Sequence, residues 1–163
     1  MNTNKSAIMA LIVLSAAACK KDDPEPPTTT TPTMATIRMG FEFLNGMNDY
    51  QLGEQLTDSA GNAMKFDKVR FYASNVELMD MDGNEMAHFH DTYMLAEVGG
   101  SNSWTLGDVD PGHIHMLRFN VGLDSLTNHQ DPTLAEAPLN DATMHWGWNP
   151  AAGYKFIVIE GRV

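Results

Sequence analysis

The chain has 163 residues, 43% of them hydrophobic and 19% charged, which suits one compact domain and leaves little room for a second. Its formal net charge of -11 argues against a nucleic-acid backbone or an anionic membrane face as a partner. From residue 36 to the end there are seven Lys/Arg and eighteen Asp/Glu, so the acidity belongs to the folded body. Cations are therefore the ligands that the body favours.

Residues 1–18 have the features of an export signal, with Lys5 ahead of the apolar run AIMALIVLSAAA, which is too short to span a bilayer. The stretch LSAAAC followed by KKDDPE resembles a bacterial lipoprotein signal, in which the cysteine, here Cys19, becomes the lipidated first residue. Ala16 stands where such signals usually carry leucine, although Leu14 is close. The acidic residues after Cys19 resemble surface-export signals of lipoproteins.

We therefore expect an outer-membrane lipoprotein that faces the periplasm or the cell surface. Plain secretion with cleavage near Ala18 is the alternative. Cys19 is the chain's one cysteine, so either route gives a body without disulfides. Residues 19–35 are rich in Pro and Thr and predict an extended tether, followed by a single domain at residues 36–163.

Apolar residues in this domain recur with period two, which is typical of strands. The pattern covers Ile37, Met39, Phe41 and Phe43, and later Val69, Phe71 and Ala73. Further strands are expected in NEMAHFHDTYMLAEV, TLGDV, HIHMLRFNVGL and YKFIVIEGRV, with turns at Asp82-Gly83 and Pro111-Gly112. TLAEAPLNDA is the one place where a short helical turn is expected, ended by Pro138. The pattern predicts an all-β fold, an antiparallel sandwich or barrel.

All six histidines lie in the second half of the chain, and four of them form two His-x-His pairs. They are His88, His90, His113, His115, His129 and His145. On a strand both imidazoles of a pair face the same side, which suits a copper or zinc site. Alternatively, HFHD is a solvated strand face with Phe89 inward, and His113 and His115 lie at the rim of the core.

Other residues offer weaker signals. Twelve methionines are many for this length, and Met144 beside His145 is a candidate soft ligand for Cu(I), although methionine also fills irregular cores. Asp80, Asp82 and Asn84 faintly resemble a calcium loop, but a hairpin explains them more simply. Signatures of hydrolases, phosphate loops and zinc proteases are absent from the sequence, so we expect a binding protein and not an enzyme.

Five segments occur in the order that is typical of one family: KVRFYASNVELMDMDGNE, GHIHMLRFNVGLD, NHQDP, APLND and MHWGWNPAAGYKFIVIEG. With them the sequence resembles the MbnP-like family of periplasmic copper-binding proteins over about residues 36 to 163. The resemblance implies a β-sandwich that binds copper through histidines, often together with a dihaem cytochrome of the peroxidase-like type. In relatives that partner oxidises a tryptophan next to the copper.

Position by position, the family's MxWxW falls on Met144, Trp146 and Trp148, and its NHxD falls on Asn128, His129 and Asp131. Its GYKF segment falls on residues 153–156. Two departures matter: the disulfide cysteines of some relatives are missing, and relatives continue into a further histidine-bearing strand. The missing strand has two possible explanations. Either the sandwich and its site are incomplete at the C-terminus, or the sequence is truncated.

Three hypotheses follow. The first is a lipid-anchored copper-binding protein with a histidine site near the tryptophans. The second is an anchored module that binds a protein or a glycan, with Trp104, Trp146 or Trp148 as stacking surfaces. The third is zinc in place of copper, which imidazole ligands alone barely exclude.

Overall fold

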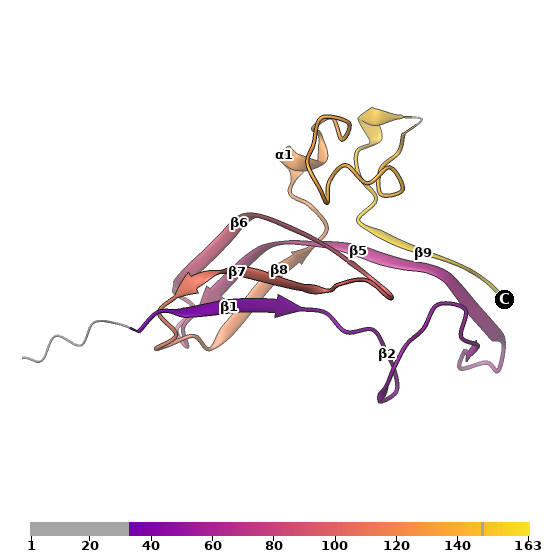
Figure 1. Cartoon of the computed structure of the whole chain (residues 1–163), viewed down its shortest axis with the longest axis horizontal. Coiled ribbons are helices and arrows are strands. Elements are labelled where there is room, and N and C mark those ends of the chain that lie inside the picture. Colours follow the sequence, from indigo (N-terminus) through magenta and orange to yellow (C-terminus); the bar gives the residue numbers. More distant parts are fainter. Residues whose placement is uncertain (1–32, 148) are drawn as a thin grey trace, which may run out of the picture. The chain divides into compact units, whose positions relative to one another are not determined.

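The computed structural model of this protein describes residues 33–147 and 149–163. In this part of the chain the strands are β1 Ala35–Gly40, β2 Leu44–Asn45, β3 Asn48–Asp49, β4 Leu56–Thr57, β5 Ala63–Met79, β6 Glu85–Glu97, β7 Ser103–Val109, β8 Met116–Val121 and β9 Ile157–Arg162 (Figure 1). Helical turns are confined here to α1 Ser125–Asn128 and η1 Pro150–Ala152. The all-β antiparallel fold expected from the sequence is confirmed, while residues 1–32, including Cys19, and Trp148 lie outside the described residues.

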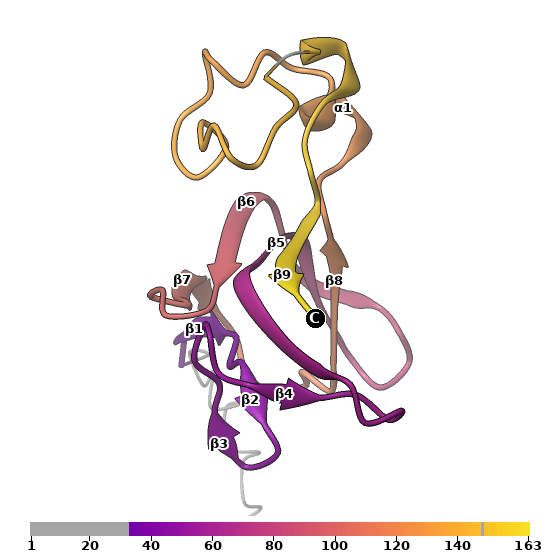
Figure 2. The ribbon, with the colours of Figure 1, turned by 90° about the vertical axis from the view of Figure 1, so that its right-hand side faces the viewer.

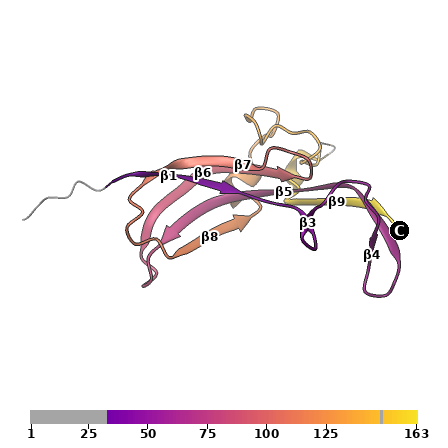
Figure 3. The same ribbon diagram turned by 60° about the horizontal axis from the view of Figure 1, so that its bottom comes forward.

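The long strand β5 is the axis of the larger sheet. It pairs antiparallel with β6 along one edge, and with β8 and β9 along the other, since single residues such as Ala73 have a partner on each side, Met94 and Val121. The short β4 pairs with its first residues. Figure 3 shows β6, β8 and β9 beside β5, so β9, far away in sequence, completes the edge that β8 begins.

A second, two-stranded sheet of β1 and β7 packs on one face of β5. Side chains alternate between the two faces of β5, and each face has its own hydrophobic core. Phe71 and Ala73 pack with Met39 of β1, whereas Tyr72 packs on the opposite face. The expected period-two patterns are thus confirmed in β1 and β5. Exposed apolar side chains remain on the outer strands of the larger sheet, at Leu117, Val121, Ile157 and Ile159.

Asn75 interrupts the alternation of β5. Its backbone has a φ of 55°, and the pairing register with β6 shifts between Ser74 and Val76. Relative to β8, β5 has one extra residue here, since Ser74 pairs with Asn120 and Glu77 pairs with Arg118. This β-bulge returns Val76 to the core face and leaves Glu77 on the other side. Asparagine is one of the few residues that tolerate this left-handed conformation.

Residues 124–156, here called the loop segment, connect β8 to β9 and contain α1 and η1 (Figure 2). The prediction of a helical turn in TLAEAPLNDA is wrong: residues 133–142 form turns, a bend and irregular chain, and the residue before Pro138 is disfavoured in a helical conformation. The helix lies earlier, at Ser125–Asn128. The strand expected from HIHMLRFNVGL starts at Met116, because the chain turns at Gly112 and His113 and residues 114–115 are not yet part of the strand.

Candidate functional site

The loop segment begins at Asp124, which caps α1. Its carboxylate accepts hydrogen bonds from the Thr127 backbone N–H at 2.9 Å and from the Thr127 hydroxyl at 2.7 Å. These bonds, led by the hydroxyl, hold the pKa of Asp124 below its usual range. Tyr93 of β6 bonds the same hydroxyl at 2.7 Å, which ties α1 to the sheet.

Three of the sequence motifs meet in the loop segment. The Asn128 side-chain oxygen accepts a bond from the Tyr154 backbone N–H at 2.9 Å. Gly153, with a φ of 75°, lies so close to Asn128 that an added Cβ would come within 2.6 Å of it. His145 forms a β-bridge with Tyr154, and the Trp146 N–H donates to the Gly153 carbonyl at 3.2 Å. NHxD, MxWxW and GYKF therefore form one contact unit.

Side chains of the larger sheet anchor the remainder of the loop segment. The Tyr72 hydroxyl donates to the Pro138 carbonyl at 2.9 Å. Arg70 of β5 bonds Asp141 at 2.8 Å and also pairs with Glu97 of β6. Burial acts to raise the pKa of Asp141, but hydrogen bonds from Thr143 and the charge of Arg70 outweigh it and lower the pKa.

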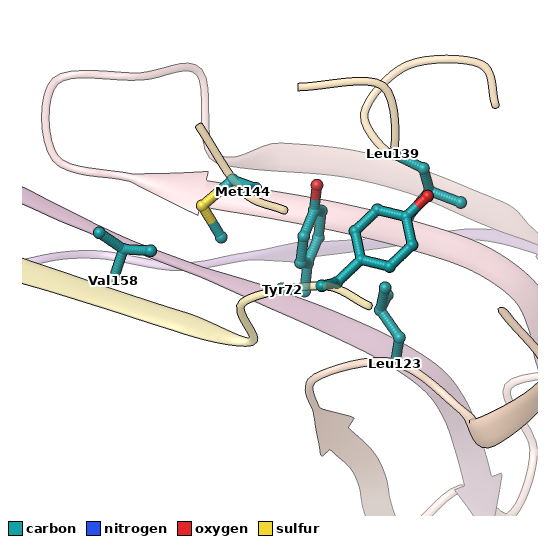
Figure 4. Packing of buried hydrophobic residues seen from close by; sticks show 6 residues of the cluster. Tyr72, Leu123, Leu139, Met144 and Val158 are labelled. Carbon is teal, nitrogen blue, oxygen red and sulfur yellow. The ribbon is translucent and has the colours of Figure 1, made fainter. Parts of the chain in front are cut away.

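Met144 is fully buried in this anchor. It packs in one cluster with Tyr72, Leu123, Leu139 and Val158 (Figure 4). Its sulfur thus lies among core side chains, which favours the core-filling role over the ligand role.

His129 follows α1 directly and has a defined tautomer. Its Nδ1 lies 2.6 Å from the Ser125 carbonyl oxygen, which can only accept a hydrogen bond. In the neutral ring Nδ1 therefore carries the proton, and Nε2 keeps its lone pair. A backbone carbonyl on one imidazole nitrogen is the usual way of orienting the other nitrogen toward a metal.

His145 lies within the electrostatic reach of Asp131. Hydrogen bonds from Thr133 lower the pKa of Asp131 first, and the charge of His145 lowers it further. Burial raises the pKa of the Tyr154 hydroxyl, and the charge of Asp131 adds to that effect. The Tyr154 ring is 6.4 Å from the His145 ring, centre to centre, in an edge-to-face arrangement. One imidazole, one carboxylate and one phenol thus share this part of the loop segment.

Trp146 is 38% exposed, and the Lys155 ammonium lies 4.7 Å from its ring centre. Lys155 also donates to the Thr143 carbonyl at 3.2 Å. A positive charge over an indole face makes that indole harder to oxidise. The second tryptophan of the motif, Trp148, lies outside the described residues. Trp104, the third candidate for a stacking surface, packs against the core beside Phe41.

His88 and His90 lie on β6, outside the loop segment. Their rings are 5.3 Å apart, and Phe89 between them packs into the core on the opposite face, as the sequence alternative had it. Glu77, paired with His88 across the strands, is buried and bound by Arg118 of β8. Both imidazoles thus belong to a polar face of the larger sheet.

His113 and His115 precede β8 and do not form a strand pair. The His115 N–H donates to the Met79 carbonyl at 2.9 Å, which continues the β5–β8 pairing by one residue. The spacing argument for shared orientation applies only within a strand, so it fails for this pair. Among the residues that the structure describes, no three His, Cys, Asp or Glu side chains are gathered for a metal ion.

Residues 80–84 form the hairpin turn that the sequence favoured over a calcium loop. Asp80 accepts backbone N–H bonds from Asp82 at 2.9 Å and Asn84 at 2.8 Å, so its carboxylate is occupied by its own turn. Residues 58–62 form the same Asp-x-x-Gly-Asn arrangement, with Asp58 in the equivalent role. Sequence reasoning missed this second turn and the cap at Asp124, although an Asp before a short polar run signals both.

Comparison with known proteins gives a family. The family profile described as MbnP matches residues 35–163. Among solved structures, MbnP from Methylosinus trichosporium superposes with a TM-score of 0.61 at 20% identity, over 79% of this chain and 55% of that chain. The matched part thus spans little more than half of that protein, and the likeness concerns the fold. A search of curated proteins gave no match. Within residues 33–147 and 149–163, no helix has the length and apolar character needed to cross a membrane.

Proposed function

The chain belongs to the MbnP family, and from this we propose that it is a copper-binding protein that works outside the cytoplasm. The acidic composition supports a cationic ligand, and the imidazoles supply donors that suit copper. Zinc is the less favoured metal, because divalent copper binds nitrogen sites more tightly.

We place the copper ligands at His129 and His145. The observation that carries this choice is the bond between His129 Nδ1 and the Ser125 carbonyl, which leaves Nε2 as the ring's free donor. His145 belongs to the same contact unit through its bridge to Tyr154. The donor set fits copper chemically, since neutral imidazole binds both Cu(I) and Cu(II). The protein's part is to hold the two rings and, in Asp131, to supply a nearby negative charge.

The remaining features of the proposal come from the sequence. Cys19 would carry a lipid that holds the domain at the outer membrane, with residues 19–35 as the tether. A dihaem cytochrome would be the redox partner, and Trp146 or Trp148 the oxidised residue. Lys155 over Trp146 favours Trp148 for that oxidation. No turnover by this chain is proposed.

The alternative is an interaction module without metal. The partial exposure of Trp146, at 38%, favours it, because the exposed part of an indole can stack on a sugar or a partner side chain. The two functions differ in one measurable respect, since the module would keep its partner when its histidines are removed.

The test is copper binding by the full-length protein and two double variants. His129→Ala with His145→Ala should lower copper affinity by on the order of a hundredfold or more, because both proposed donors are lost. His113→Ala with His115→Ala removes the same number of imidazoles elsewhere and should leave copper affinity unchanged. Stoichiometry and affinity that survive in the first variant would exclude those two histidines. The intact mass of protein from its native compartment would reveal a tryptophan that has lost one carbon and gained one oxygen.

A further inference from the structure

A second group of possible metal donors lies on β6. His88 and His90 alternate along the strand, and their rings are 5.3 Å apart at an angle of 77°. Phe89 packs into the core, which fixes both imidazoles on the other face of the sheet. Two imidazoles on one side of a strand offer two nitrogen donors to a single ion.

Hydrogen bonds determine which nitrogen of His88 is free. Asn75 donates through its Nδ2 to the Glu77 carboxylate at 3.2 Å, so its Oδ1 is the atom that lies 2.8 Å from His88 Nε2. An amide oxygen only accepts, so His88 Nε2 carries the proton. His88 Nδ1 therefore keeps the lone pair.

That lone pair lies next to a negative charge. The Nδ1 atom of His88 is 3.5 Å from a carboxylate oxygen of Glu85, and neither atom has a proton to share when the ring is neutral. Two acceptors at this distance repel each other, and a cation on Nδ1 removes the repulsion. A proton does so, and so does a metal ion bound to Nδ1.

His90 also lies next to a carboxylate. Its Nε2 is 3.1 Å from a carboxylate oxygen of Asp91. The His90 side chain is 67% exposed. Glu77 is neutralised by Arg118, whereas no ion pair to a Lys or Arg is present for Glu85 or Asp91 within the described residues. The local charge therefore favours a divalent cation.

We propose that His88 and His90 form a second metal site, which binds Cu²⁺ through two imidazole nitrogens, with water in the other positions and Glu85 beside it. Cu²⁺ is preferred over Zn²⁺ because it forms the stronger bonds to nitrogen and accepts a tetragonal arrangement with two cis imidazoles. With two protein ligands, binding is weaker and exchange is faster than in a closed site. The inference does not rest on the copper site proposed at His129 and His145.

The experiment adds Cu²⁺ alone to the full-length His129→Ala/His145→Ala variant. Electron paramagnetic resonance should show coupling to two equatorial nitrogens. Adding His90→Ala should lower Cu²⁺ affinity by at least about tenfold, because the chelate becomes a single ligand, and should leave one coupled nitrogen. His90 is largely exposed, so the fold should be unaffected, as circular dichroism would check.

Adding His113→Ala and His115→Ala instead is the matched control, and both the affinity and the two-nitrogen signal should persist. The proposal is wrong if the signal survives His90→Ala, if it disappears with the control pair, or if the starting variant binds no Cu²⁺. None of these results concerns the site at His129 and His145, which is already absent from the starting variant. Failure of the two proposals is therefore distinguishable.

Discussion

Single residues at the junctions of this fold have several roles at once. Asn75 adopts a left-handed conformation, forms the bulge in β5, and connects the buried Glu77 to His88 through its side-chain amide. Ser74 next to it donates to the Gly122 carbonyl at 2.8 Å, which joins β5 to the end of β8. These residues belong to the family segments KVRFYASNVELMDMDGNE and GHIHMLRFNVGLD. At this scale, the motifs by which the family is recognised hold the strands and the loop segment together.

The backbone of Asn75 can be tested apart from its side chain. Asn75→Ala and Asn75→Gly both lose the bonds to Glu77 and His88, and they differ only in the Cβ at a φ of 55°. Because a Cβ is costly in this conformation, we expect Asn75→Gly to be more stable than Asn75→Ala by about 1 kcal/mol. Urea unfolding of the two variants measures the difference. Equal stabilities would mean that the bulge relaxes when the side-chain bonds are lost.

At the scale of elements, the strands were predictable and their partners were not. Alternation and the Asp82-Gly83 turn predicted the β5–β6 hairpin, because both signals are local. The pairings of β1 with β7 and of β5 with β9 join distant segments, and no local pattern encodes them. The apolar residues of the loop segment follow no fixed period. Its turns are held by side-chain hydrogen bonds to the sheet, which no sequence period signals.

The candidate site was predictable to a similar extent. The spacing of His88 and His90 correctly gave a shared face, because β6 continues through both residues. The same argument failed for His113 and His115, because His113 lies in a turn and both precede β8. The contact between NHxD and GYKF depends on Asn128 and Gly153. No rule based on sequence spacing predicts that these two residues lie close together.

Arg70 is the connection between elements that we expect to matter most. Its side chain is 14% exposed and joins β5 to β6 through Glu97, and to the loop segment through Asp141. Arg70→Met should destabilise the protein by about 2 kcal/mol, because two carboxylates lose their partner in a partly buried place. Amide hydrogen exchange should increase most strongly in residues 124–156, whose anchor is lost.

Arg162→Met is the control for this change. Arg162 pairs with Asp67 at 2.9 Å, but both side chains are at least half exposed, so the pair is screened by solvent. We expect a loss below about 1 kcal/mol and unchanged exchange in the loop segment. If both variants behaved alike, Arg70 would not anchor the loop segment.

At the scale of the whole molecule, charge and hydrogen-bonded carboxylates act on stability in opposite directions as the pH falls. The net charge of -11 makes the folded chain repel itself at pH 7, and this repulsion disappears toward the isoelectric point near 4.7. Asp124 and Asp141, which hold the loop segment, have lowered pKa values in the folded state. Such carboxylates stabilise the fold above their unfolded pKa, near 3.8, and this stability is lost as the pH falls through their folded pKa.

The free energy of unfolding at low salt should therefore rise modestly from pH 7 to about pH 5 and fall below about pH 4. About 0.5 M NaCl should remove the rise, because it screens the repulsion, and should leave the acid decline largely in place, because the Asp124 bonds to Thr127 are short and local. Asp124→Asn can still cap α1 but cannot titrate, so its decline below pH 4 should be shallower than that of the parent. Urea titrations at pH values across this range measure both the rise and the decline of the free energy of unfolding. A decline of equal steepness in Asp124→Asn would exclude Asp124 as its source and would leave the other carboxylates with lowered pKa values, Asp141 and the turn residues Asp58 and Asp80.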